Sequence, residues 1–207
     1  MYIKVLPLGL VDANCYILCD ENKCGAVIDA GDYTPRLQMA IKESGIEKLL
    51  YIICTHGHFD HVSGVARLKE KYPEAKVVVG EADAPALSSA FISGAEAFGL
   101  PFYPCYADVT VNDGDVLQVG SILLKVIATP GHTLGGVVLY CESEKIAFAG
   151  DTLFRGSVGR TDLYGGSYAQ LMTSIKKIKN LPPDTALMCG HGDSTTVQFE
   201  MEHNPYL

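Results

Sequence analysis

Apolar runs in this chain end repeatedly in tight turns that carry histidine or aspartate. The run LLYIIC leads into THGHFDH (55–61), which holds three histidines and one aspartate in seven positions. Three more segments follow the same pattern, and they are IATPGHT (127–133), IAFAGDT (146–152) and LMCGHGD (187–193). In these three a glycine directly precedes the histidine or aspartate, and glycine lets the backbone turn sharply where groups crowd together. The pattern favours a fold of strands whose polar exits meet at one centre.

The first half of the chain alternates short apolar segments with amphipathic ones. Strands are expected at IKVLPL, NCYILC, GAVIDAG, LLYIICT and AKVVVG, because these segments are rich in Val and Ile and bounded by turn residues. A helix is predicted from an N-cap at Thr34 to a stop at Gly45, and a second over 62–72. Asp83 and Pro85 indicate the start of a third helix.

The second half begins with hairpins and ends with one predicted helix. Asp113-Gly114 between alternating runs is a strong turn signal, and strands are expected at VTV, VLQVG, SILLKVIAT, GVVLYC, IAFAGD and finally TALMC. The last helix is predicted from Ser167, with a capping box to Gln170, to about Lys179. Apolar strands need cover on both faces, so an α/β (α+β) sandwich is expected, with helices outside two packed mixed sheets in a single domain over 1–207.

Composition places the chain among ordinary globular proteins. Of its 207 residues, 48% are hydrophobic and 19% charged, and the net charge of −8 offers no broad basic surface for nucleic acid. No segment approaches the ~20 apolar residues of a membrane span, and the N-terminus lacks the uninterrupted apolar region of a signal peptide. Seven cysteines without a Cys-x-x-Cys motif suggest neither a disulfide framework nor a thiolate metal cage, so a cytoplasmic location is expected.

The histidine cluster has the spacing of a metal site. In an extended segment, residues two apart point the same way, so His56 and His58 can reach one point. The turn that follows swings Asp60 and His61 toward a second point. Two metal ions could therefore share this loop. His203 belongs to no such pattern and is expected to be a surface or packing residue.

THGHFDH followed by PGHT, GDTLF and CGHG resembles the metallo-β-lactamase fold superfamily, and VIDAGD (27–32) and NDGDVLQVG (112–120) match its pattern too. The resemblance implies an αββα sandwich with the metals at one edge between the sheets. It implies that His56, His58 and His132 hold one metal and that Asp60, His61 and His191 hold the other. Asp151 would bridge them. Such nitrogen and oxygen ligands suit zinc, with iron or manganese as alternatives.

The segment GDTLFRGSVGRTDLYGG (150–166) most resembles glyoxalase II and its shorter bacterial relatives, which hydrolyse S-acylglutathione thioesters such as S-lactoylglutathione. A hydroxide bridging two metals would be the nucleophile, with Asp60 and Asp151 as catalytic residues. The chain ends 16 residues after His191, so no helical glutathione-binding domain is expected, and recognition of glutathione is left open. Antibiotic hydrolysis is disfavoured because zinc β-lactamases commonly lack the bridging aspartate.

Four residues near these motifs, Arg155, Arg160, Asp29 and Asp162, are candidates for binding substrate or supporting the metal ligands. Arg155 and Arg160 could bind a substrate carboxylate, but a structural pair of Arg160 with Asp162 behind Asp151 is favoured. Asp29 could accept a proton from a ligating imidazole, or it could cap a turn beside Gly31.

Alternative functions follow from the same residues. A persulfide dioxygenase of this superfamily shares the Gly-Arg-Thr-Asp stretch seen at 159–162, and there His56, His132 and Asp151 would hold one Fe(II). A redox or non-catalytic metal-binding module on the same fold is the other alternative. The aromatic segment 88–107 could be a buried connection, a pocket wall or a subunit contact, and the oligomeric state is left open.

Overall fold

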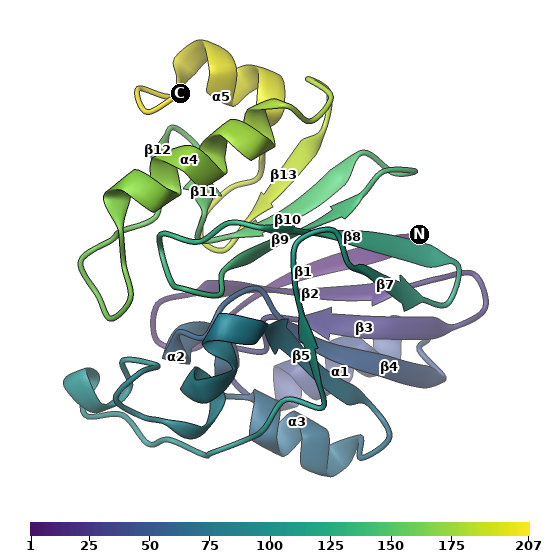
Figure 1. The fold of residues 1–207 in the computed structure, drawn as a ribbon. Coiled ribbons are helices and arrows are strands. Elements are labelled where there is room, and N and C mark those ends of the chain that lie inside the picture. The colour runs from purple at the N-terminus through teal and green to yellow at the C-terminus, as the bar shows by residue number, and fades with distance from the viewer.

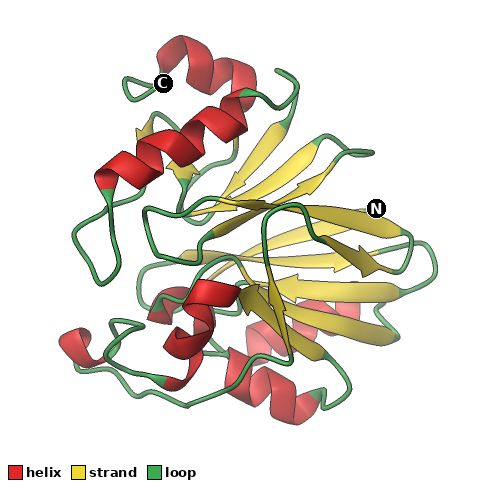
Figure 2. Ribbon diagram, viewed as in Figure 1, coloured by secondary structure: helices red, strands yellow, loops and turns green.

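Two six-stranded sheets face each other, and helices cover both outer faces (Figures 1 and 2). The computed structural model describes residues 1–207. The strand order is β1-β2-β3-β4-β5-β6 in the first sheet and β14-β13-β10-β9-β8-β7 in the second. Both sheets are mixed, because β3 to β6 run parallel and so do β10 and β13, whereas the other pairs are antiparallel. The predicted αββα sandwich is confirmed.

The first sheet and its helices come from the first half of the chain. Its strands are β1 (Tyr2–Leu8), β2 (Ala13–Cys19), β3 (Cys24–Ile28), β4 (Lys48–Cys54), β5 (Lys76–Gly80) and β6 (Val109–Val111). On its outer face lie α1 (Pro35–Glu43), which begins where Thr34 caps the Leu37 N–H, and α3 (Val65–Lys71). Leu37 of α1 and Leu68 of α3 are fully buried against this face, and their apolar stripes hold the helices to the sheet.

The second sheet comes from the second half. Its strands are β7 (Val116–Val119), β8 (Ile122–Ala128), β9 (Val137–Cys141), β10 (Ile146–Gly150), β13 (Ala186–Cys189) and β14 (Thr195–Thr196). Helices α4 (Tyr168–Lys179) and α5 (Val197–His203) cover its outer face. Leu171 of α4 and Val197 of α5 belong to an apolar cluster between these helices and the sheet. A third cluster fills the space between the sheets, with Ile53 of β4 and Phe148 of β10 fully buried.

Several elements differ from the sequence prediction. The helix expected over 62–72 is shorter than predicted, because α3 begins only at Val65 and Val62 ends a separate short helix, α2 (Phe59–Val62). The helix expected after Asp83 is a 3₁₀ segment, η1 (Glu81–Ser88), with Pro85 inside it, where proline removes a backbone donor. A second 3₁₀ turn, η2 (Glu96–Phe98), follows. The segment 185–189 is not the last strand and α4 is not the last helix, because β14 and α5 come after them.

Strand ends at one edge of the sandwich place the polar turns. His56 follows β4, Asp151 follows β10 and His191 follows β13, each within two residues. Hydrogen bonds tie these exits to the opposite sheet, since the Val137 N–H donates to the Thr55 carbonyl at 2.8 Å and the Asn14 N–H donates to Gly190 at 2.7 Å. The two sheets are therefore hydrogen-bonded to each other at this edge. No helix of the chain has the length and apolar character needed to cross a membrane.

Candidate metal centre

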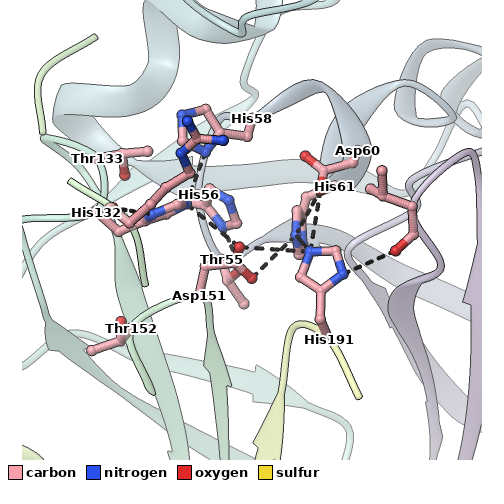
Figure 3. Close-up of polar contacts among 12 residues, drawn as sticks. Thr55, His56, His58, Asp60, His61, His132, Thr133, Asp151, Thr152 and His191 are labelled. Atoms are coloured by element: carbon pink, nitrogen blue, oxygen red, sulfur yellow. Dashed lines mark hydrogen bonds and ion pairs between the residues drawn. The ribbon is translucent and has the colours of Figure 1, made fainter. Parts of the chain in front are cut away.

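The seven histidine and aspartate side chains singled out in the sequence meet at this edge. Figure 3 shows three histidines on one side of Asp151 and Asp60 with two histidines on the other. Three sets of three residues each offer donor atoms that lie within 4.8 Å of one another inside the set. The sets are His56, His58 and His132; His56, His61 and Asp151; and Asp60, His61 and His191. The side chains singled out in the sequence thus lie close together, although some of them come from segments that are more than 70 residues apart in the chain.

The first group consists of three imidazole nitrogens. His58 Nδ1 and His132 Nε2 lie 2.8 Å apart, and the ring centres of His56 and His132 are separated by 4.8 Å. His56 Nε2 is buried and has no hydrogen-bond partner. Three nitrogens that face one point form a donor set suited to zinc or another transition metal.

The second group combines a carboxylate with two imidazoles. His191 Nε2 lies 3.2 Å from Asp60 Oδ2 and 3.3 Å from His61 Nε2. His61 Nε2 and Asp60 Oδ2 are 3.7 Å apart. These separations leave the three atoms around one point at the C-terminal end of β13.

Asp151 lies between the two groups. Its Oδ2 is 3.5 Å from His132 Nε2 and 3.6 Å from His191 Nε2, so it faces both sides. Its Oδ1 lies 3.3 Å from His61 Nε2, yet it is buried and accepts no hydrogen bond. Buried polar atoms without partners are rare in proteins, and this centre contains two of them, Asp151 Oδ1 and His56 Nε2. Divalent cations would satisfy both, so the residues present fit a metal centre with two positions.

The nitrogens that face away from the centre are also held. Four of the five imidazoles are oriented by a partner on their far side, as is common for ligating histidines. The contacts are His61 Nδ1 to Asp29 Oδ2 (3.0 Å), His132 Nδ1 to the Arg160 carbonyl (2.8 Å), His191 Nδ1 to the Val11 carbonyl (3.2 Å) and His56 Nδ1 to Thr55 Oγ1 (3.1 Å). Because carbonyl and carboxylate oxygens only accept, Nδ1 of His61, His132 and His191 carries a proton, and Nε2 is the nitrogen directed at the centre.

The electrostatics of the two groups differ. Burial and the neighbouring imidazoles hold the pKa of His56 well below its ordinary value, and burial with His132 lowers the pKa of His58 to about 4, so both rings are neutral near pH 7. Burial opposes a charge on His61, but the carboxylates of Asp151 and Asp29 raise its pKa well above the ordinary value. Burial likewise opposes the charge on Asp60, but hydrogen bonding and charge from His191 and His61 lower its pKa to about 2. The second group therefore favours positive charge, whereas the first group consists of neutral imidazoles.

Asp29 connects both groups. Its carboxylate accepts from the Thr55 N–H and the Thr55 hydroxyl, each at 2.7 Å, and from His61. The Thr55 hydroxyl is in turn within hydrogen-bonding distance of His56 Nδ1. Of the two interpretations of Asp29, the structure shows the contact with an imidazole, and its carboxylate caps no turn beside Gly31.

Asp83 is a site residue that the sequence did not reveal. Its buried carboxylate accepts from the Gly57 N–H (2.9 Å), the Thr133 hydroxyl (2.7 Å) and the Gly135 N–H (2.6 Å). It thereby joins the loop of His56 and His58 to the loop of His132. Burial raises its pKa. The available signal was an aspartate three residues beyond a buried strand, which the sequence predicted only as a helix start.

Replacing Asp83 with asparagine should loosen both loops. The side-chain amide cannot accept from three donors as the carboxylate does, so a buried N–H loses its partner. We expect the free energy of unfolding of the metal-free protein to fall by about 2 kcal/mol, measured by urea denaturation. Asp184→Asn is the matched control, because Asp184 is an exposed carboxylate paired with Lys145. An unchanged unfolding midpoint for Asp83→Asn would contradict this role.

The arginines lie outside the centre. Arg160 forms two hydrogen bonds with Asp162, at 2.7 and 2.8 Å, and its carbonyl holds His132. The structural pair is therefore the arrangement observed, and Asp162 contacts no proposed metal ligand. The expectation for Arg155 is corrected, because its guanidinium packs over the Phe199 ring of α5 at 4.6 Å and does not line the cavity at the centre.

A cavity of about 280 Å³ opens over the centre. Its polar floor includes Asp60, Asp151 and His58, and Phe98 and Leu163 form part of its walls. Phe98 packs against Phe59 with tilted rings whose centres are 5.1 Å apart. Of the alternatives for the segment 88–107, a buried connection is wrong, because the aromatic side chains of this segment are largely exposed; residues around Phe98 instead form a pocket wall.

Comparison with known proteins identifies the family. The metallo-beta-lactamase superfamily profile matches residues 8–191. A Haemophilus influenzae protein named hydroxyacylglutathione hydrolase GloC is 34% identical over 210 residues, which are 100% of this chain and 98% of that protein.

Two solved structures are similar over the full length. The structure of BLEG-1 B3 metallo-beta-lactamase is 34% identical with a TM-score of 0.94, and the match covers 100% of this chain and 99% of the other. The structure of TTHA1623 in a di-iron-bound form is 35% identical with a TM-score of 0.89, covering 99% of this chain and 100% of the other. The sequence match, the sandwich and the histidine and aspartate centre agree, and the chain belongs to the metallo-beta-lactamase superfamily, whose members are generally hydrolases.

Proposed function

We propose that the protein is a metal-dependent thioester hydrolase of the glyoxalase II type. The observation that carries the proposal is the position of Asp151 between two groups of nitrogen and oxygen donors, with buried atoms on both sides that lack partners. The similarity to a protein named hydroxyacylglutathione hydrolase over nearly the whole of both chains supports thioesters as the substrate class.

The proposed ligands follow the two groups. His56, His58 and His132 would hold one cation, Asp60, His61 and His191 the second, and Asp151 both. Zinc suits a set of imidazoles and carboxylates, and iron suits it as well. A similar protein has been solved in a di-iron-bound form, so iron is a direct competitor to zinc in our proposal. Manganese remains a third choice by ligand type.

Two divalent cations in this centre would supply hydroxide at neutral pH and polarise the thioester carbonyl. Asp60 lines the cavity and its carboxylate is held ionised, so it can accept a hydrogen bond from the attacking group and orient it. Asp151 fixes the spacing of the two groups from its buried position. His132 and His61 keep their orientation through the Arg160 carbonyl and Asp29. A thiolate is a good leaving group, so no separate general acid is required.

Two other activities compete with this proposal. A persulfide dioxygenase with one iron on His56, His132 and Asp151 would leave the second group without a role, although the structure gathers its three side chains. Hydrolysis of β-lactams is disfavoured by the aspartate between the groups, but it is a candidate because the structure with a TM-score of 0.94 is described as a B3 metallo-beta-lactamase.

One sample of purified protein can separate these activities. The same preparation is analysed for metal content and assayed with S-lactoylglutathione and S-acyl-N-acetylcysteamine thioesters, with glutathione persulfide in an oxygen electrode, and with a chromogenic cephalosporin. We expect two metal equivalents and thioester cleavage that a chelator abolishes. One iron with oxygen uptake would support the dioxygenase instead. Bound metal without any turnover would support the non-catalytic module.

A further inference from the structure

A second cavity adjoins the one over the metal centre. It measures about 520 Å³ and shares His58, Gly94 and Leu163 with the first cavity. Because the two share lining residues, they lie side by side, and we call the second cavity the lateral groove. The residues that line only the lateral groove are Phe91, Ile92, Glu96, Ala97, Asp162 and Tyr164.

Two loops build the lateral groove. One is the aromatic segment around η2, and the other is the loop that enters α4, which approaches that segment in Figure 1. Phe91 and Tyr164 meet edge to face across them, with ring centres 5.8 Å apart. Both rings are more than half exposed, at 63% and 52%. Exposed aromatic surface gathered beside a polar centre is typical of a binding site.

The charges in the groove disfavour an anionic ligand. Glu96 and Asp162 line the lateral groove. Arg160 is the single Lys or Arg side chain among the lining residues of both cavities, and two hydrogen bonds commit its guanidinium to Asp162. Glutathione carries two carboxylates and one ammonium group at neutral pH. No free cation in these walls can pair with its carboxylates.

We infer that the lateral groove binds an uncharged apolar group of the substrate, so that the preferred substrates are thioesters with a medium-length aliphatic or aromatic acyl chain on a thiol other than glutathione. This inference rests on the proposed function and narrows its substrate class. The thioester carbonyl lies over the metal centre, and the chain passes His58 to reach Phe91 and Tyr164. Each methylene removed from water against these rings strengthens binding in the transition state, which is the selectivity that a hydrophobic pocket supplies.

Steady-state kinetics test the acyl preference. We expect kcat/KM for S-hexanoyl-N-acetylcysteamine to exceed that for the S-acetyl compound by at least tenfold and to exceed that for S-lactoylglutathione. In the double variant Phe91→Ser, Tyr164→Ser, the ratio of hexanoyl to acetyl should fall at least fivefold. Met39→Ser is the matched control, because Met39 is an equally exposed apolar residue on α1, outside both cavities, and its variant should keep the ratio of the natural sequence.

A second measurement does not depend on turnover. Calorimetry gives the Kd of the thioether S-hexyl-N-acetylcysteamine, which cannot be hydrolysed, and of S-hexylglutathione. We expect the neutral thioether to bind more tightly and the double variant to bind it at least fivefold more weakly. Glu96→Lys should shift the ratio of the two affinities toward the glutathione compound, because it replaces a repelling carboxylate with a cation.

The outcomes separate the two proposals. Thioester cleavage with no hexanoyl preference, or with a preference that the double variant leaves unchanged, overturns the groove inference and leaves the proposed function standing. Absence of thioester cleavage together with thioether binding that depends on Phe91 and Tyr164 overturns the proposed function and supports the groove as an apolar site. Absence of both overturns both.

Discussion

Replacing Asp151 with alanine should abolish hydrolysis and lower the metal content of the protein. Its carboxylate faces His132 and His191 through one oxygen and His61 through the other. In the proposed centre it neutralises part of the charge of both cations, and without it two like charges lie side by side in a buried site. We expect kcat/KM for the thioester to fall by at least about 10³-fold, on the scale of losses when a charge-stabilising group is removed from an active site.

The measurement pairs thioester kinetics with elemental analysis after gel filtration. His203→Ala serves as the control, since His203 is an exposed residue that stacks on Phe199 and should affect neither value. Asp151→Asn keeps the shape of the side chain but removes its charge and one of its two acceptor oxygens. An Asp151→Ala protein with full activity and unchanged metal content would remove Asp151 from the bridging role.

Replacing Asp29 with alanine should have the largest effect on stability together with a loss of metal. The change leaves the buried Thr55 N–H and hydroxyl without their acceptor and releases His61, so we expect the free energy of unfolding to fall by about 3–5 kcal/mol. Asp29 also adopts a left-handed backbone with φ of 55°, where alanine is strained. Loss of a partner that orients a ligand typically weakens metal binding by about 10–100-fold.

Two variants separate these contributions. Asp29→Asn retains a side chain that tolerates the left-handed backbone, so it should lose metal affinity with a smaller loss of stability. Asp32→Ala is the matched control, because the Asp32 carboxylate accepts only from the neighbouring Tyr33 N–H. Chemical denaturation and metal competition with a chelator measure both quantities. Equal stability of Asp29→Ala and Asp32→Ala would show that the buried hydrogen bonds of Asp29 contribute little.

The sequence was sufficient to predict those strands, helix starts and site positions that depend on neighbouring residues. The runs before His56, Asp151 and His191 are apolar for the length of a buried strand, and each is followed by a turn, so strand and site position could be predicted together. Thr34 and Ser167 likewise marked helix starts, and both cap their helices in the structure. Such signals depend on a few neighbouring residues and do not require knowledge of the fold.

Short strands, the last helix and several contacts of the site could not be predicted, because tertiary contacts determine them. The strands β11 (Leu153–Phe154), β12 (Ser157–Val158) and β14 have two residues each, too few for a pattern of alternation. Helix α5 has seven residues, and its position depends on Glu200, which accepts from Thr195 in the buried interior. Backbone carbonyls such as that of Val11, which holds His191, have no side-chain signal at all. Asp83 joins loops from both sheets, a proximity visible only in the folded chain.

The most direct test of the central claim is anomalous X-ray diffraction from crystals of the metal-loaded protein, recorded at the absorption edge of the metal found by elemental analysis. Our account predicts two anomalous peaks, one among His56, His58 and His132 and the other among Asp60, His61 and His191, with Asp151 in contact with both. A single peak held by one group, or peaks located away from these seven side chains, would contradict it.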